Sequence, residues 1–231
     1  TYSCAIFEPE NLSLHDASIG KLDRICRKLN INSDDHIIEI GTGWGSFAFH
    51  AAKKYGCKVT TTTISNRQHE YVSKMISAEK LESKITLLKE DYRSLSGKYD
   101  KLVSIEMIEA VGYNFIQNFF ETCSSLLKPN GLMAIQGITY HEQGFENHLK
   151  AVDFIKKYIF PGSNLISVNH VLSTIKSYTD LSLVHLEDIT KYYAETLKLW
   201  RDKYKDELDK IKDMGYSCLL YTSDAADDVN G

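Results

Sequence analysis

The sequence has no long apolar run, no paired cysteine motif and no large excess of one charge. Its longest apolar-rich stretch, Leu132 to Ile138, is far shorter than the about 20 residues that a membrane-spanning helix needs. We therefore expect no transmembrane segment. The net charge is −4 over 231 residues, so the charge balance gives no reason to expect nucleic acid as a partner. Internal repeats and low-complexity segments are also absent from the sequence.

Cysteine usage argues against both disulfides and metal. The five cysteines are odd in number and scattered, and none forms a C-x-x-C pair. Such a pattern favours neither a zinc site nor a disulfide framework, so we predict no metal. No signal-peptide pattern opens the sequence. We expect a protein of the reducing cytoplasm.

What is present is an alternation of strand and helix patterns. Hydrophobic residues make up 43% and charged residues 25% of the chain, which suits one α/β domain with a sizeable core. Short apolar or β-branched runs alternate with helical periodicity, and this predicts a mostly parallel, doubly wound sheet. The expected helices are Ala17 to Leu29, Phe47 to Tyr55, Asn66 to Leu81 and Phe115 to Leu127, and a further one ends near Tyr158. The expected strands are His36 to Ile40, Lys58 to Ile64, Ile85 to Leu88, Lys101 to Ile105 and Leu132 to Ile138.

Both ends of the chain look truncated. The sequence begins at Thr1, inside a motif. Cys218 to Asp227 matches, codon for codon, a widely used transposase sequencing adapter. We therefore predict a catalytic domain over 1–217 and a non-native, adapter-derived tail over 218–231. We interpret Ser182 to Leu186 as a sixth strand and Thr190 to Ile211 as a helix, and we expect the last strand of the sheet to be missing.

The strongest chemical signal follows the first strand, where Glu39 precedes three glycines, Gly41, Gly43 and Gly45, with Trp44 between the last two. Glycines let the backbone turn sharply and approach a ligand closely, and the next helix offers free N–H groups. A carboxylate before the first glycine suits a cationic ligand. S-adenosylmethionine carries an ammonium and a sulfonium, so the pattern favours a Rossmann-like S-adenosylmethionine fold over a purely structural turn.

Polar residues also follow the second and third strands. The second strand lacks the acid that commonly holds a ribose, which leaves Thr63 and Gln68 to make neutral hydrogen bonds. Strand propensity and a helix cap at Ser65 explain these two residues equally well. Asp91 and Tyr92 follow the third strand, where an adenine amine and ring face would fit.

Taken together, these residues resemble the cyclopropane-fatty-acyl-phospholipid synthase family, which includes the mycolic acid cyclopropane synthases. The resemblance covers nearly all of Tyr2 to Tyr204. It implies S-adenosylmethionine as cofactor, with Tyr2 and Ser3 in contact with it and Gly41 at its methionine end. Thr63 and Gln68 would lie by the ribose, and Asp91 and Tyr92 by the adenine. The markers are Tyr2 to Ala5, Glu39 to Gly45, Thr63 to Ser65 with Gln68, Asp91 to Arg93, Met107 to Gly112, Tyr158 to Gly162, and Tyr193 to Leu197 with Trp200.

The resemblance also implies a catalytic group around a bound bicarbonate. Cys4, Glu109 and Tyr193 match family positions that surround this ion, with the backbone of Ile138 beside them. The family's histidine at this site falls at Gln136, which can hydrogen-bond but cannot titrate. Without the resemblance, Glu109 is equally well a helix-start carboxylate, Cys4 a packing residue and Tyr193 an aromatic helix contact.

The chemistry implied is the transfer of a methylene or methyl group to the cis double bond of an unsaturated phospholipid acyl chain, forming a cyclopropane ring. An alkene is a poor nucleophile, so it must be held in line with the sulfonium methyl in a dry pocket. Glu109 would stabilise positive charge or hold the base. Phe154, Tyr158, Ile159 and Phe160 suit an acyl channel, but we favour core packing for them.

Two alternatives remain. A C- or N-methyltransferase of the same family acting on another lipid or small molecule would share the cofactor residues. A membrane-bound module without activity would share only the fold, and the presence of Glu109, Cys4 and Tyr193 argues against it. The resemblance implies unsaturated phospholipid acyl chains at the membrane surface as partners, and therefore a protein peripheral to the membrane. A homodimer is compatible with the sequence.

Overall fold

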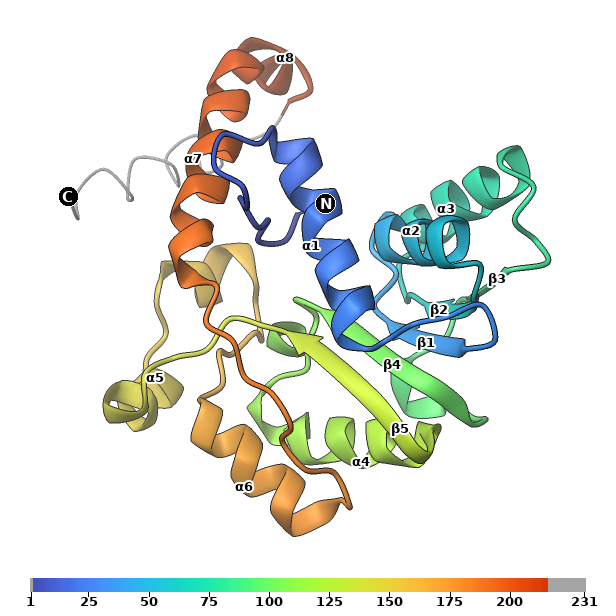
Figure 1. Cartoon of the computed structure of the whole chain (residues 1–231). Coiled ribbons are helices and arrows are strands. Elements are labelled where there is room, and N and C mark those ends of the chain that lie inside the picture. The colour runs from blue at the N-terminus through green and yellow to red at the C-terminus, as the bar shows by residue number, and fades with distance from the viewer. Residues whose placement is uncertain (1, 216–231) are drawn as a thin grey trace. The chain divides into compact units, whose positions relative to one another are not determined.

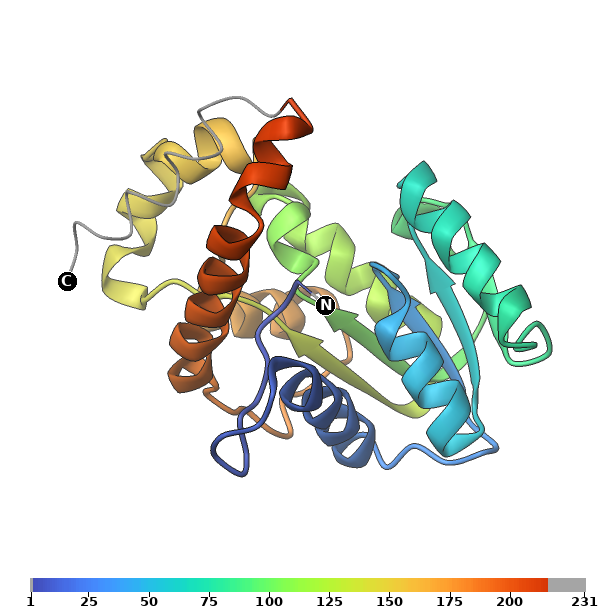
Figure 2. The ribbon, with the colours of Figure 1, turned by 90° about the horizontal axis from the view of Figure 1, so that it is seen from above.

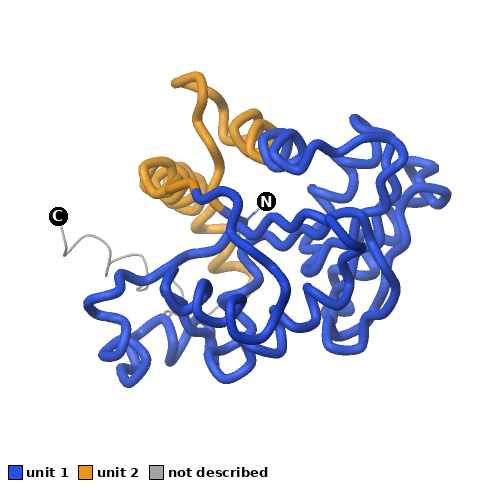
Figure 3. The backbone as a smooth tube through the Cα atoms, turned by 60° about the horizontal axis from the view of Figure 1, so that its bottom comes forward, with its two compact units in different colours: residues 1–3, 22–186 blue, residues 4–21, 187–231 orange. Residues whose placement is uncertain are grey.

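A computed structural model describes residues 2–215 of the chain (Figure 1). The chain divides into two compact units, coloured separately in Figure 3. Unit 1 comprises residues 1–3 and 22–186, and unit 2 comprises residues 4–21 and 187–231. One of the boundaries between the units falls inside helix α1 (Leu14–Lys28). The tail predicted over 218–231 lies outside the described residues.

Unit 1 contains a five-stranded sheet with the strand order β3-β2-β1-β4-β5. Every neighbouring pair is parallel, which confirms the expected parallel sheet. Parallel strands need crossover connections, and helices supply them here. The strands are β1 (His36–Ile40), β2 (Lys58–Thr62), β3 (Ile85–Leu88), β4 (Tyr99–Ile105) and β5 (Leu127–Gln136).

Helices cover both faces of this sheet, as a doubly wound fold requires. Helices α2 (Ser46–Tyr55) and α3 (Asn66–Ala78) lie next to each other, as Figure 2 shows. On the opposite face, α4 (Ile116–Leu126) packs against α6 (Val168–Tyr178). The shorter elements of unit 1 are η1 (Tyr92–Ser94), η2 (Ile108–Ala110), η3 (Tyr113–Phe115), η4 (Glu142–Gly144), α5 (Phe145–Lys150) and the π-helix η5 (Ile155–Ile159).

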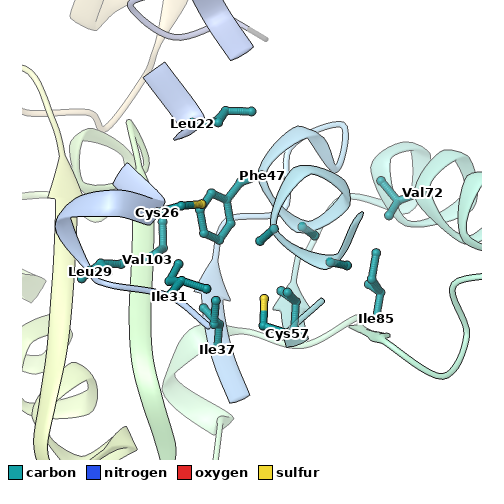
Figure 4. Close-up of a cluster of buried hydrophobic side chains, with 14 of the residues drawn as sticks. Leu22, Cys26, Leu29, Ile31, Ile37, Phe47, Cys57, Val72, Ile85 and Val103 are labelled. Carbon is teal, nitrogen blue, oxygen red and sulfur yellow. The ribbon is translucent and has the colours of Figure 1, made fainter. Parts of the chain in front are cut away.

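The apolar side chains of the central strand alternate between two cores. Ile37 belongs to a cluster with α2, α3 and the last turns of α1, where Figure 4 shows Cys26 and Phe47. Ile38 and Ile40 point to a second cluster, built with α4 and α6. Because side chains alternate along a strand, a run that is apolar throughout can fill both faces.

Local chemistry explains where two helices depart from their predicted ends. Helix α1 begins at Leu14, before the predicted Ala17, because Ser13 Oγ accepts a hydrogen bond from the Asp16 N–H at 3.1 Å. This is an N-cap interaction. Helix α3 ends at Ala78, before the predicted Leu81, and Lys80 has a left-handed φ of 55°. A left-handed residue cannot continue a right-handed helix.

The prediction of a sixth strand at Ser182 to Leu186 is wrong. This segment has no regular structure, and Leu183 and Val184 are 51% and 79% exposed. A strand exists only through hydrogen bonds to a neighbour, and β5 is the last strand at its edge of the sheet among residues 2–215. Helix α6, which precedes this segment, is absent from the sequence-based prediction.

Unit 2 is helical. It contains the first turns of α1, together with α7 (Thr190–Asp206) and α8 (Leu208–Asp213), where the sequence predicts one continuous helix. The N-terminal segment and α7 share a small core that includes Phe7, Ala17 and Tyr192. They are also joined by a hydrogen bond from the Ala5 N–H to Thr196 Oγ1 at 3.1 Å.

Candidate active site

The glycine turn after β1 lies at the carboxyl edge of the sheet, where ligands of such folds bind. Gly41 has a φ of +100°, and a Cβ on it would lie 3.0 Å from the Met107 side chain. Gly43 has a φ of +53°, and a Cβ there would come no closer than 3.9 Å, to the Tyr2 hydroxyl. Gly45 is the N-cap of α2. The turn therefore packs on the loop after β4 at Gly41 and faces Tyr2 at Gly43.

Glu39 lies beneath this turn rather than on it, with only 2% of its surface exposed. Thr61 Oγ1 donates a hydrogen bond to Glu39 Oε2 at 2.6 Å, and Thr42 Oγ1 lies 2.6 Å from Thr61 Oγ1. Burial raises the pKa of Glu39 to about 8, although the hydrogen bond from Thr61 opposes the shift. A cation bound near the turn would favour the charged form of this carboxyl.

The two polar residues after β2 form a chain of hydrogen bonds with Tyr2. Thr63 Oγ1 donates to Gln68 Oε1 at 2.6 Å, and Gln68 Nε2 donates to the Tyr2 hydroxyl at 3.1 Å. Ser65 Oγ also accepts from the Gln68 N–H, which caps α3. Ser65 is therefore a helix cap, as one of the two explanations predicted. The Gln68 side chain takes no part in this cap and contacts Thr63 and Tyr2 instead. The chain brings Thr63, Gln68 and Tyr2 together opposite Gly43.

Asp91 and Tyr92 have partners within the protein. Arg93 binds both carboxylate oxygens of Asp91, through Nε at 2.9 Å and Nη2 at 2.7 Å. These hydrogen bonds lower the pKa of Asp91. The Tyr92 ring packs edge-on against Phe119 of α4, with centroids 5.5 Å apart. Binding of adenine by Asp91 stays a prediction. The adenine amine would have to compete with Arg93 for the Asp91 carboxylate, or share it.

The remaining predicted cofactor residues differ in exposure. Ser3 is buried, with 7% of its surface exposed. The half-exposed Trp44 ring packs edge-on against Tyr71 of α3, with centroids 5.4 Å apart. This contact holds the Trp44 ring beside α3.

Glu109 and Ile138, predicted as catalytic neighbours, are in direct contact. The Ile138 N–H donates a hydrogen bond to Glu109 Oε1 at 2.6 Å. Glu109 Oε2 is buried and has no hydrogen-bond partner among the described residues. Burial raises the pKa of Glu109, and the nearby carboxylate of Glu106 raises it further. A buried carboxylate with one unsatisfied oxygen suits a proton acceptor or a site for positive charge.

Gln136, where the family resemblance places a histidine, lies at the end of β5. Its Nε2 donates a hydrogen bond to Glu106 Oε1 at 2.8 Å. The sequence analysis did not single out Glu106, although it directly precedes the Met107 to Gly112 marker. No local pattern distinguishes it, because its contact depends on the pairing of β4 with β5.

Cys4 and Tyr193 lie in unit 2 and belong to the same apolar cluster there. Cys4 is 1% exposed, and its Sγ lies 3.3 Å from the Ala5 carbonyl oxygen. The packing explanation of Cys4 therefore has support within unit 2. The grouping of Cys4 and Tyr193 with Glu109 stays a prediction.

The preference for core packing of Tyr158, Ile159 and Phe160 is wrong. These residues are 47%, 36% and 62% exposed, as part of η5 and the residue after it. None of the helices within residues 2–215 has the length and apolarity needed to cross a membrane.

The sequence profile of a family described as mycolic acid cyclopropane synthetase matches residues 1–223. This match ends inside the predicted adapter-derived tail, whose origin stays a prediction. The tuberculostearic acid methyltransferase UfaA1 of Mycobacterium tuberculosis is 34% identical over 225 residues, which cover 94% of this chain and 52% of that protein. The chain thus spans about half the length of this relative.

Solved structures agree with the fold. The mycolic acid cyclopropane synthase CmaA1, complexed with SAH and CTAB, superposes with a TM-score of 0.83 at 26% identity. The superposed region covers 91% of this chain and 76% of the CmaA1 chain. Coclaurine N-methyltransferase, bound to N-methylheliamine and SAH, gives a TM-score of 0.78 at 25% identity, covering 93% of this chain and 63% of its own. The fold is the Rossmann-like fold of S-adenosylmethionine methyltransferases.

Proposed function

Because the chain belongs to the mycolic acid cyclopropane synthetase family, we propose that it transfers a one-carbon unit from S-adenosylmethionine to an unsaturated phospholipid acyl chain. The reaction closes a cyclopropane ring across the cis double bond. The observation that carries the proposal is the buried Glu109 carboxylate at the carboxyl edge of the sheet. Glu109 lies two residues after Met107, and the Met107 side chain would be 3.0 Å from a Cβ on Gly41 of the glycine turn.

Tyr2, Thr63, Gln68 and the glycine turn would hold the cofactor. Gly43 fits this role because its positive φ and the open space before Tyr2 leave the backbone accessible to a ligand. Glu39 beneath the turn provides negative charge for the ammonium once it is ionised. S-adenosylmethionine supplies, when bound, an electrophilic methyl group on a sulfonium.

We assign two roles to Glu109 Oε2: it stabilises the positive charge that develops on the acyl chain, and it accepts the proton that is lost. When the double bond attacks the methyl carbon, a carbon–carbon bond would form as the bond between the methyl carbon and the sulfonium sulfur breaks, S-adenosylhomocysteine would leave, and positive charge would develop on the acyl chain. Loss of a proton from the transferred carbon then closes the ring. A buried carboxylate stabilises such a charge, and its raised pKa makes it a better proton acceptor than an ordinary glutamate.

Bicarbonate also fits this site. The unpaired Glu109 Oε2 suits a ligand that donates a hydrogen bond, and bicarbonate has a hydroxyl to donate. Bound there, bicarbonate would take the proton in place of Glu109, and Glu109 would hold this base. Gln136 and the Ile138 backbone are the further residues that we propose to surround it.

The membrane surface is the proposed location of the substrate. Five apolar residues with exposed fractions from 36% to 74% lie close together in the segment 150–160. The segment carries three lysines and one aspartate in a chain of net charge −4. Exposed apolar side chains beside lysines are typical of surfaces that enter the headgroup region of an anionic bilayer. The apolar residues are Val152, Ile155, Tyr158, Ile159 and Phe160.

The test is product analysis with labelled cofactor. The protein is incubated with S-adenosylmethionine carrying an isotopic methyl label and with vesicles of cis-unsaturated phospholipid, and the acyl chains are analysed by mass spectrometry. Cyclopropanation adds CH₂ and removes the double bond. Glu109→Gln should lower turnover by about 100-fold while cofactor affinity stays nearly unchanged. Glu121→Gln, an exposed carboxylate on α4, is the matched control and should retain full turnover.

The same assay separates the second candidate function, which is methyl transfer without ring closure. The name of the relative, tuberculostearic acid methyltransferase, favours it. A labelled product that gains a methyl or methylene branch and keeps a double bond would identify this reaction. If the protein binds the cofactor but no lipid becomes labelled, both functions are refuted.

A further inference from the structure

Glu106 has a backbone conformation that is unfavourable for its residue type. It follows β4 with a left-handed φ of +46°. Five non-glycine residues among those described have positive φ, and three of them are asparagines, which tolerate this region. The fourth, Lys80, lies two residues after the end of helix α3. Glu106 is the one that lies at the carboxyl edge of the sheet, within the candidate site. Strain of this kind persists where surrounding contacts hold it in place.

Two hydrogen bonds to a single residue hold Glu106 there. Ile105 pairs with Gln136 in the ladder of β4 and β5. Directly after this pair, the Glu106 N–H donates to the Gln136 carbonyl oxygen at 2.7 Å. The Gln136 side chain returns the contact, since its Nε2 donates to Glu106 Oε1 at 2.8 Å. The backbone and the side chain of Glu106 thus both bind Gln136.

A second carboxylate binds the same loop two residues later, where Glu109 Oε1 accepts from the Ile138 N–H at 2.6 Å. Gly137 lies between these two contacts, and a Cβ on it would come within 2.8 Å of the Ile108 side chain. The loop after β5 is therefore held at both ends by carboxylates of the loop after β4. There is no room at Gly137 for a side chain without movement of Ile108.

We propose that Glu106 is a positioning residue that fixes the orientation of the Gln136 amide in the site around Glu109. An ionised carboxylate only accepts hydrogen bonds, so the NH₂ group of Gln136 must face Glu106. The amide carbonyl Oε1 is then the atom that Gln136 presents on its other side, as an acceptor. A histidine at this position can be a donor or an acceptor, whereas the amide has one fixed polarity set by Glu106. The catalytic consequence rests on the proposed function, but the anchoring itself does not.

The test uses Glu106→Gly, because glycine adopts a positive φ without strain and lacks the carboxylate. Lys80→Gly is the matched control, since it removes the same strain from an exposed residue near the amino end of β3. Both variants should fold with melting temperatures near that of the parent, because relief of backbone strain offsets the entropy that glycine adds to the unfolded chain. In the lipid assay, Glu106→Gly should lower kcat by about 10-fold with an unchanged KM for S-adenosylmethionine. Lys80→Gly should match the parent in both constants.

Glu106→Gln is the conservative variant, because its amide oxygen still accepts from Gln136 Nε2. It should keep kcat within about threefold of the parent. Glu106→Asn replaces the glycine variant if that protein does not fold, since asparagine tolerates a positive φ but its side chain is too short to reach Gln136. A kcat of Glu106→Gly within twofold of the Lys80→Gly value would overturn the catalytic role.

A spectroscopic readout tests the anchoring without any turnover. The Gln136 side-chain NH₂ resonances, assigned by their loss in Gln136→Leu, should differ between the parent and Glu106→Gly, because the hydrogen bond to the Glu106 carboxylate is lost. They should keep their parent positions in Lys80→Gly. If no variant or parent modifies lipid, the proposed function fails while this measurement still decides the anchoring. Resonances that are identical in parent and Glu106→Gly would refute it.

Discussion

Glu39 combines deep burial with a charge-dependent role. Its carboxylate is hydrogen bonded to Thr61 beneath the glycine turn, and burial raises its pKa from 4.5 to about 8. At neutral pH the group is mostly protonated in the free protein. A cationic ligand near the turn would favour ionisation, so binding and proton release would be coupled.

We predict a pH-dependent affinity for S-adenosylhomocysteine, which carries the same ammonium group as the methyl donor. Between pH 7 and 8 the ionised fraction of Glu39 rises, and affinity should increase about threefold to fivefold. Glu39→Gln should bind more weakly and lose this dependence. Isothermal titration calorimetry at both pH values measures it, and a parent affinity that is flat with pH would contradict the role of Glu39.

The same carboxyl makes folding stability depend on pH. Its folded pKa is raised, so its contribution is fully present below about pH 4.5 and is lost as pH rises through about 8. In Glu39→Gln this loss should be absent, and the variant should gain in melting temperature relative to the parent as pH rises. The comparison separates a weakened ligand site from a damaged fold.

At the scale of elements, α1 is held to α2 by a cluster around Asp23. Tyr55 donates to Asp23 Oδ1 at 2.7 Å, and the Lys54 ammonium lies 2.7 Å from the same oxygen. His50 Nε2 lies 3.3 Å from it. Burial alone would raise the pKa of Asp23, but hydrogen bonds from these residues outweigh it and lower the pKa from 3.8 to about 2.

We predict that Asp23→Asn lowers the free energy of unfolding by about 1–2 kcal/mol at pH 7. A lowered folded pKa gives stability that is present above about pH 4 and lost as pH falls through about 2. The difference between the parent and the variant in urea denaturation should therefore shrink below about pH 4 and disappear below about pH 2. Arg27→Ala is the control: its guanidinium is 69% exposed at 3.4 Å from Asp23, and its loss should cost less than about 0.5 kcal/mol. Equal effects of the two substitutions would show that the cluster contributes nothing beyond a surface ion pair.

At the scale of the whole molecule, the proposed membrane surface over 150–160 predicts where lipid binding resides. Phe160→Ser should weaken binding to vesicles that contain phosphatidylglycerol by about 10-fold. The exposed phenylalanine ring would be buried in the headgroup region on binding, and serine cannot replace this apolar contact. Val184→Ser is the matched control, since Val184 is 79% exposed but lies outside this segment. Co-sedimentation at two salt concentrations measures both effects. Equal losses in the two variants would contradict a localised surface.

Local sequence patterns were sufficient for the sheet and the glycine turn. The apolar run of β1 and the β-branched run of β2 are strands in any context that buries them, and glycine spacing identifies a turn without knowledge of distant residues. The chain of Thr63, Gln68 and Tyr2 was predicted as a set of cofactor residues from the family resemblance, and the structure brings these residues together.

Only the tertiary structure decided the outcome where a residue depends on a distant partner. Ser182 to Leu186 has strand-like composition, but without a neighbouring strand it has no regular structure. Tyr158 to Phe160 reads as core by hydrophobicity, yet burial requires something to pack against. Glu106 gained its contact to Gln136 from the register of β4 and β5, which lie 30 residues apart at this contact. Local propensity is written in neighbouring residues, whereas pairing, burial and site geometry arise from contacts between segments that are far apart in the sequence.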